Sequence, residues 1–148
     1  FYLGVLKKIF PKAKIINCKR NAASSIMSIF KRNLGEVIWS HNLDNIFKYF
    51  DIYNTLTKNF KKLYPNFMYE LEYEKLVTNP ENESKKLLNF CNLPWDKKCL
   101  EFYKRKDLPS RTASKLQIRK AIYKDSLSTH PAYKTLLKKY GDKYSWFN

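Results

Sequence analysis

The sequence is poor in glycine, histidine and cysteine, and each shortage excludes a class of function. Only three glycines occur in 148 residues, at Gly4, Gly35 and Gly141. They lie too far apart for a Walker phosphate loop or a dinucleotide-binding fingerprint, which need clustered glycines so that the backbone can approach a phosphate. Two histidines and three cysteines, without metal-ligand spacing, predict neither a metal site nor a disulfide framework.

Acidic residues are also scarce, with 13 Asp and Glu against 29 Lys and Arg, which gives a net charge of +16. This surplus favours an anionic partner such as nucleic acid, an acidic membrane face or a phosphorylated small molecule. The alternative is that the lysines reflect a genome with a bias toward lysine codons, which would place lysine on every protein surface. The even spread of lysines along the chain fits this alternative. No apolar run approaches the roughly 20 residues of a membrane span.

The apolar content is high enough for one packed domain. Hydrophobic residues make up 44% of the chain and aromatic residues 16%, which argues against a disordered protein. The first residues include no initiator Met and lack the order of a signal peptide, so we expect a fragment whose N-terminal part is missing. Free thiols, with Cys91 and Cys99 expected to be buried, and the lack of an export signal favour a cytoplasmic protein.

Hydrophobic spacing predicts an α/β fold, because a short β-prone run is followed by an amphipathic helix. The run is 13–18, and the helix, 22–31, directs Ala22, Ile26, Ile29 and Phe30 inward. The other predicted elements are a helix over 2–10 ended by Pro11, a long helix over 42–63, a strand over 66–71, a helix opened by Asn79 and Pro80 with Leu87, Leu88 and Cys91 inward, a short helix over 96–103, a long ordered loop over 104–128 and a helix over 133–140.

The first candidate site lies where the strand over 13–18 passes into its helix. Arg20 occupies this junction, and in open α/β sheets ligands bind at the carboxyl ends of strands. A helix N-terminus offers free N–H donors and favours an anion by about 0.3–1 kcal/mol. A guanidinium grips phosphate with two hydrogen bonds, and Ser24 and Ser28 add hydroxyls on the polar side of the helix. The segment predicts a phosphate-binding site; the alternative is a solvated turn before an ordinary helix.

The second candidate site is the basic, hydroxyl-rich segment 110–123. Its apolar residues could anchor it over an anionic cofactor and exclude water. The alternative is a lysine-rich surface loop.

Two further motifs complete a family resemblance, Tyr73–Pro80 and Leu88–Trp95. These two motifs lie between the two candidate sites along the chain. Together, in that chain order, the four segments resemble the sulfotransferases that use 3′-phosphoadenosine 5′-phosphosulfate (PAPS). The chain is most similar to tyrosylprotein sulfotransferases and to bacterial sulfotransferases with tetratricopeptide repeats. The resemblance spans about residues 1–140. It implies a P-loop-NTPase-like sulfotransferase fold, of which residues 1–148 form the C-terminal half, with a short parallel sheet flanked by helices.

The resemblance implies seven cofactor-binding residues in the two segments and between them. They are Arg20 and Ser28 for the 3′-phosphate, Arg32 as a further basic contact, Tyr73 as a cofactor-contacting tyrosine, Ser114 at the start of the loop that wraps the nucleotide, and Gln117 and Tyr123 within that loop.

The activity that the resemblance implies is transfer of a sulfuryl group from PAPS to an acceptor hydroxyl, with protein tyrosine among the candidate acceptors and no metal. The family's 5′-phosphosulfate loop and its general-base glutamate do not occur in this sequence, so no catalytic residue is assigned. Two alternatives stay open. One is a basic nucleic-acid-binding module, for which no motif is present, and the other is an inactive, cofactor-binding relic.

Overall fold

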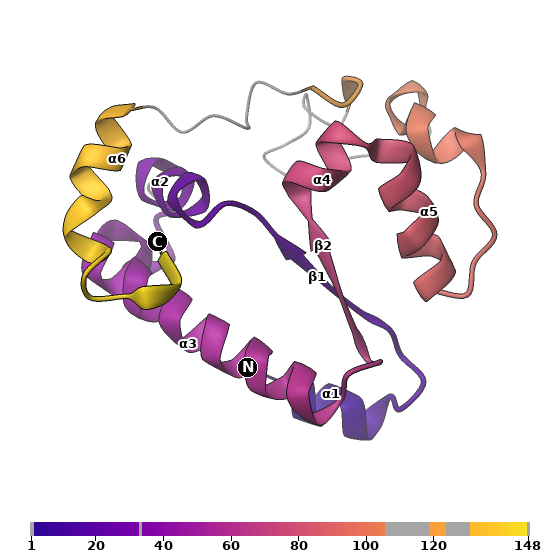
Figure 1. The fold of residues 1–148 in the computed structure, drawn as a ribbon, viewed down its shortest axis with the longest axis horizontal. Coiled ribbons are helices and arrows are strands. Elements are labelled where there is room, and N and C mark those ends of the chain that lie inside the picture. The colour runs from indigo at the N-terminus through magenta and orange to yellow at the C-terminus, as the bar shows by residue number, and fades with distance from the viewer. Residues whose placement is uncertain (1, 33, 106–118, 124–130, 148) are drawn as a thin grey trace.

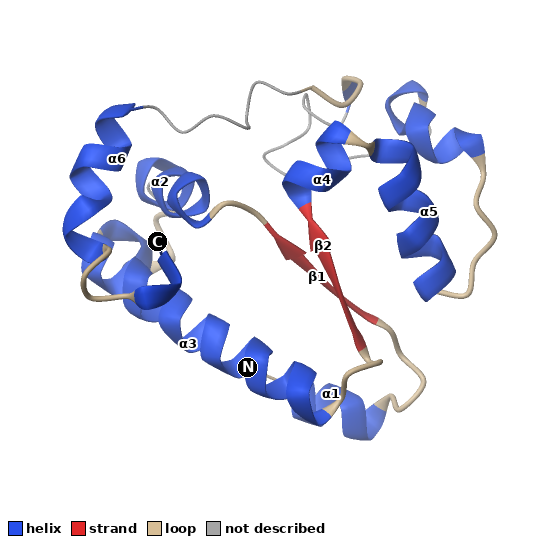
Figure 2. Cartoon of the chain, viewed as in Figure 1, coloured by secondary structure: helices blue, strands red, loops and turns tan. Residues whose placement is uncertain are grey.

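The computed structural model of the chain describes residues 2–32, 34–105, 119–123 and 131–147 (Figure 1). Helices dominate, and two short strands lie between them (Figure 2). With 3₁₀-helices labelled η, the elements in chain order are α1 (Leu3–Ile9), β1 (Ile15–Lys19), α2 (Ala22–Arg32), η1 (Ile38–His41), α3 (Leu43–Leu63), β2 (Met68–Glu72), α4 (Tyr73–Thr78), α5 (Pro80–Phe90), η2 (Lys97–Lys104), α6 (Pro131–Leu137), η5 (Lys138–Tyr140) and η6 (Ser145–Phe147).

The two strands pair in parallel, with Ile15 opposite Met68 at one end and Lys19 opposite Glu72 at the other. Parallel strands need a crossover connection, which α2 and α3 supply. In Figure 1, α2 and α3 lie to one side of the strands, and α4 and α5 lie to the other. The carboxyl ends of β1 and β2 therefore meet at one edge of the sheet. The predicted fold class, a short parallel sheet flanked by helices, is confirmed.

The larger core cluster lies where the first half of α3 meets α2 and the C-terminal residues. Phe47 is fully buried, and its ring stacks on that of Tyr140 with 4.0 Å between centroids. Burial, and then a hydrogen bond to Asp44, raise the pKa of Tyr140 to about 12, so its hydroxyl stays neutral. The buried members of this cluster are Ile26, Met27, Ile46, Phe47, Leu137, Tyr140 and Tyr144.

A second, smaller core cluster lies at the opposite end of α3. It consists of Phe60, Phe67 and Met68, with Leu3 of α1 and Ile15 of β1 packed against it. This cluster fixes the beginning of both strands against the C-terminal part of α3.

Several predicted elements are confirmed with small shifts in their bounds. The long helix is α3, and the side chain of Asn42 accepts a hydrogen bond from the Asn45 N–H at 3.2 Å, as an N-cap does. The helix after Asn79 is α5, but the Asn79 side chain makes no capping hydrogen bond, contrary to expectation. The chain already turns helical in α4 just before this residue, a short helix that the sequence analysis missed.

Some predicted core positions are wrong. Phe30 of α2 is 37% exposed, and Met27 is buried instead, because α2 packs on α3 and α6 with the side that carries Ile26 and Met27. Cys99, expected to be a buried thiol, is exposed.

In α5 the residues predicted to face inward, Leu87, Leu88 and Cys91, are only half-buried. The buried residue of this helix is Glu83, whose carboxylate accepts a hydrogen bond from Lys86 at 2.7 Å. The buried carboxylate is therefore paired, as burial of a charge requires. The predicted ordered loop over 104–128 lies mostly outside the described residues.

Candidate functional site

The residues that directly follow the two strands contact each other. Arg20 follows β1, and Tyr73 follows β2 as the first residue of α4. The guanidinium carbon of Arg20 lies 5.2 Å from the centre of the Tyr73 ring, within the range of a cation–π contact. The contact continues the parallel register by one position beyond Lys19 and Glu72. The sheet thus holds two of the predicted cofactor-binding residues together.

The turn between β1 and α2 is held by Asn21. Its side-chain oxygen accepts a hydrogen bond from the Ser24 N–H at 3.0 Å, and its carbonyl accepts one from the Ser25 N–H at 3.0 Å. Asn21 is therefore the N-cap of α2. Its own N–H donates to the Glu74 carboxylate of α4 at 2.8 Å, so the two strand-end junctions are also linked at the next position.

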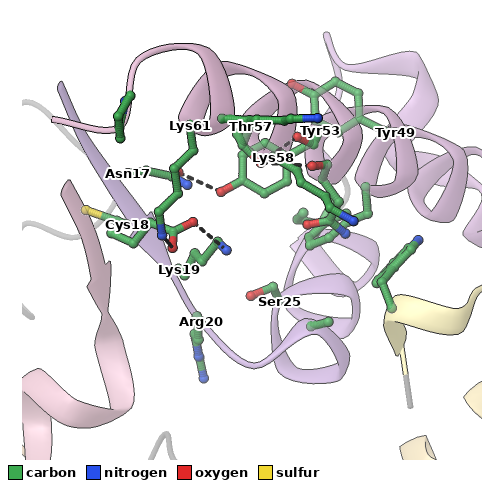
Figure 3. Close-up of a pocket in the computed structure, with 18 residues that line it drawn as sticks. Asn17, Cys18, Lys19, Arg20, Ser25, Tyr49, Tyr53, Thr57, Lys58 and Lys61 are labelled. Carbon is green, nitrogen blue, oxygen red and sulfur yellow. Dashed lines mark hydrogen bonds and ion pairs between the residues drawn. The ribbon is translucent and has the colours of Figure 1, made fainter. Parts of the chain in front are cut away.

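A pocket of about 1010 Å³ opens between β1, α2 and α3 (Figure 3). Arg20 borders it, and Figure 3 shows this side chain extending from the end of β1 away from Asn17 and Tyr53. Trp146 also lines the pocket, and its indole N–H donates to Asp51 at 2.8 Å. The polar and charged residues that line the pocket are Asn17, Lys19, Arg20, Ser25, Tyr49, Tyr53, Asn54, Thr57, Lys58, Lys61, Lys62 and Glu70.

Inside the pocket Tyr53 of α3 donates a hydrogen bond to the Asn17 side-chain oxygen at 2.6 Å. Burial raises the pKa of Tyr53, and the bond to Asn17 opposes this only in part. The amide nitrogen of Asn17 is buried, and no partner for it occurs among the described residues. This strand position therefore carries an unused donor.

Glu70 of β2 lies between two lysines, with Lys19 at 2.7 Å and Lys61 at 2.5 Å. Burial by itself would raise the pKa of the Glu70 carboxyl, but hydrogen bonds from both lysines outweigh burial and hold it below the usual 4.5. The single negative charge of this carboxylate is thus shared between two lysines that border the pocket, and the three groups together keep a net charge of +1.

Because its pKa is lowered in the folded state, Glu70 stabilises the protein above its ordinary pKa, and this stability is lost as the pH falls through the folded value. We expect Glu70→Gln to lower the free energy of unfolding at pH 7 and to have a much smaller effect at pH 3. Urea unfolding of both proteins at the two pH values measures this. A difference between the proteins that stays constant with pH would contradict the ion-pair explanation.

The other predicted site residues lie at varied depths. Ser28 is half-buried on α2, Arg32 is exposed in its last turn, and Tyr123 is 37% exposed. Among the described residues that line the pocket, Arg20 is present and these three are not. Ser114 and Gln117 lie outside the described residues.

Sequence analysis missed three residues that shape this region, Asn17, Glu70 and Glu74. The signal for Asn17 was present, since an amide interrupts an apolar run in a predicted strand. Glu74 could not be found in this way, because its partner Asn21 lies 53 residues away in the sequence. Glu70 could not be found either, because its partner Lys61 belongs to a different element, nine residues before it.

Comparison with known proteins shows the family of this chain. A family model described as "Sulfotransferase family" matches residues 1–97, about two thirds of the chain. The chain therefore belongs to the sulfotransferase family, which is a family of transferases and is consistent with the P-loop-like fold class. An uncharacterised protein of Aquifex aeolicus (strain VF5) is 35% identical over 140 residues. The match covers 92% of this chain and 18% of that relative, so the chain spans less than a fifth of the relative's length.

Over residues 2–32, 34–105, 119–123 and 131–147, no helix combines the length and the apolar character that crossing a bilayer requires.

Proposed function

We propose that residues 1–148 are the cofactor-binding, C-terminal part of a PAPS-dependent sulfotransferase domain, which transfers a sulfuryl group to an acceptor hydroxyl. The observation that carries the proposal is the contact between Arg20 and Tyr73 at the carboxyl edge of the sheet, directly before the N-cap of α2. Family membership supports sulfuryl transfer, and this junction supports binding of the donor's phosphate.

The chemistry of this junction fits the 3′-phosphate of PAPS. The N-terminus of α2 carries a partial positive charge, and Arg20 adds a guanidinium beside it. PAPS, when bound, supplies the activated sulfuryl group. The residues of this chain that we propose to hold it are Arg20, Ser28, Arg32, Tyr73, Ser114, Gln117 and Tyr123.

In this proposal the chain binds and orients its cofactor and leaves proton transfer to other residues. By analogy with phosphoryl transfer, positioning and charge stabilisation are the main contributions a protein makes to such a displacement. The Arg20 side chain is held on the Tyr73 ring by a cation–π contact. A guanidinium that is already placed loses less side-chain entropy when it takes up a phosphate, which favours tight binding.

The sheet supports the proposal that the chain is one part of a larger domain. Among the described residues, β1 pairs with β2 along one edge, and no strand pairs with the other edge of β1. Two pockets, of about 1010 and 220 Å³, border β1 and share Asn17, Tyr49, Tyr53 and Thr57. We propose that a further strand of a longer protein fills part of this space, in keeping with the greater length of the Aquifex relative.

The finer predictions are part of the same proposal. A tyrosylprotein-like subfamily, a protein tyrosine as acceptor and a cytoplasmic location stay predictions. An inactive relic would bind the cofactor through the same residues and differ only in turnover. A nucleic-acid-binding module would instead use the lysines of the pocket rim, which include Lys58, Lys61 and Lys62.

Calorimetric titration of the full-length protein with adenosine 3′,5′-bisphosphate, 5′-AMP and single-stranded DNA tests the proposal. We expect the bisphosphate to bind at least about tenfold more tightly than 5′-AMP, a difference of about 1.4 kcal/mol for the 3′-phosphate. DNA that binds more tightly than the bisphosphate, with an affinity that falls steeply with salt, would support the nucleic-acid module instead. Equal affinity for the two nucleotides would contradict a 3′-phosphate site.

A further inference from the structure

We propose that Glu74 is a positioning residue for the anion site, because it supplies from α4 the missing half of a capping box at the N-terminus of α2. The proposal rests on the proposed function, since the site that Glu74 serves is the phosphate site at Arg20. Its chemical role is to accept the N–H of the N-cap residue, Asn21, and so to fix the turn that carries Arg20.

A capping box has two reciprocal hydrogen bonds at the start of a helix. The N-cap side chain accepts the N–H of the third helical residue, and an acidic side chain at that third position accepts the N–H of the N-cap. In α2 the first bond is present, from the Ser24 N–H to Asn21 at 3.0 Å. The third helical residue here is Ser24, which has no carboxylate to accept the second bond. Glu74 accepts the Asn21 N–H instead, at 2.8 Å and from 53 residues away.

Because the acceptor comes from another element, the bond does more than cap a helix. It links the junction after β1 to the junction after β2, one residue beyond the contact of Arg20 with Tyr73. The parallel register of the strands thus continues past their ends. Arg20 contacts the ring of Tyr73, and at the next position the main-chain N–H of Asn21 donates to the carboxylate of Glu74. We infer that this second link prevents the turn from shifting relative to α4 and keeps Arg20 on the Tyr73 ring.

The carboxylate of Glu74 is used differently from those of its neighbours. Glu72 forms an exposed ion pair with Lys75 at 2.7 Å, and Glu70 pairs with lysines of β1 and α3. Glu74 instead makes a hydrogen bond to the main chain, from a half-buried position in the first turn of α4. A negative charge at the N-terminus of α2 also favours that helix electrostatically.

Three variants of the full-length protein test the role of Glu74, and each is followed by two measurements. The first measurement is hydrogen exchange of the Asn21 amide, and the second is calorimetric affinity for adenosine 3′,5′-bisphosphate. Glu74→Ala removes the acceptor, and Glu74→Gln keeps an acceptor oxygen without the charge. Glu72→Ala is the matched control, because it removes a carboxylate two residues away that is exposed and pairs with Lys75.

We expect Glu74→Ala to speed exchange of the Asn21 amide about 5- to 10-fold and to weaken bisphosphate binding by a similar factor, the effect of one lost hydrogen bond. Glu74→Gln should stay within about threefold of the wild type in both measurements, and Glu72→Ala within about twofold. In an Arg20→Ala background, Glu74→Ala should change affinity by less than about twofold, because Glu74 acts through Arg20.

Wild-type affinity in Glu74→Ala would overturn the proposal, whether or not Asn21 exchange changes. A Glu74→Gln variant as weak as Glu74→Ala would also overturn it, because glutamine keeps the acceptor. Failure of the wild-type protein to bind the bisphosphate contradicts the proposed function itself. The wild-type titration therefore separates that failure from an error about Glu74.

Discussion

Replacing Phe47 by alanine should lower the free energy of unfolding by about 3–5 kcal/mol. The side chain is fully buried and lies at the centre of the larger core cluster. Its ring contacts four others, with centroids at 4.0 Å for Tyr140, 5.4 Å for Tyr144, 5.9 Å for Trp146 and 5.0 Å for Phe147. Truncation removes these contacts and leaves a cavity between α3 and the C-terminal residues, which rigid neighbouring rings cannot fill.

Urea unfolding followed by tryptophan fluorescence measures this loss, because Trp146 belongs to the same cluster. Ile38→Ala is the matched control, because it also truncates a large apolar side chain, but one that is 84% exposed. The control should change stability by no more than about 0.5 kcal/mol. A loss below 1 kcal/mol in Phe47→Ala would show that the aromatic cluster is not the core of this half of the chain.

Replacing Arg20 by alanine should weaken binding of adenosine 3′,5′-bisphosphate by about 100-fold, or about 2.7 kcal/mol, while affinity for 5′-AMP changes little. A bidentate guanidinium–phosphate contact comprises two charge-assisted hydrogen bonds, and losing the pair costs about 3 kcal/mol. Arg20→Lys should recover only part of the loss, because an ammonium group does not present the planar pair of donors that a guanidinium does. Calorimetric titration of each variant with both nucleotides measures the effect.

Lys48→Ala is the control for net charge in this experiment. Lys48 is exposed on α3 and does not line the pocket, so its loss removes one positive charge without touching the proposed site. We expect its affinity to stay within about twofold of the wild type, because a distant exposed charge is screened by salt. If Lys48→Ala and Arg20→Ala weaken binding equally, attraction by overall charge would explain the affinity better than a defined phosphate site.

The elements that sequence predicts best here are those with clear periodicity and clear ends. The strand and helix on either side of Arg20 and the long helix α3 follow directly from hydrophobic spacing. From the resulting strand–turn–helix unit, Arg20 is expected at the carboxyl edge of the sheet. The contact of Arg20 with Tyr73 also follows once two parallel strands are aligned, since residues after their ends must lie near each other.

What sequence could not predict depends on which neighbours cover each helix. Spacing placed Phe30 on the inner side of α2, but the approach of α3 and α6 buries Met27 instead and leaves Phe30 37% exposed. The role of Glu74 is equally hidden, because its partner is a main-chain N–H and no side-chain pattern marks a main-chain donor. Helix α4 has only six residues and follows β2 without a break, so no turn residues in the sequence mark where the strand ends and the helix begins.

Helix α3 belongs to both core clusters, since it gives Ile46 and Phe47 to the larger one and Phe60 to the smaller one. Its 21 residues form a continuous hydrogen-bonded rod about 30 Å long. Unfolding of α3 at one cluster therefore removes part of the helix against which the other cluster packs. The two clusters should accordingly melt as one cooperative unit, and a proline at mid-helix, at Asn54, should split that single transition into two.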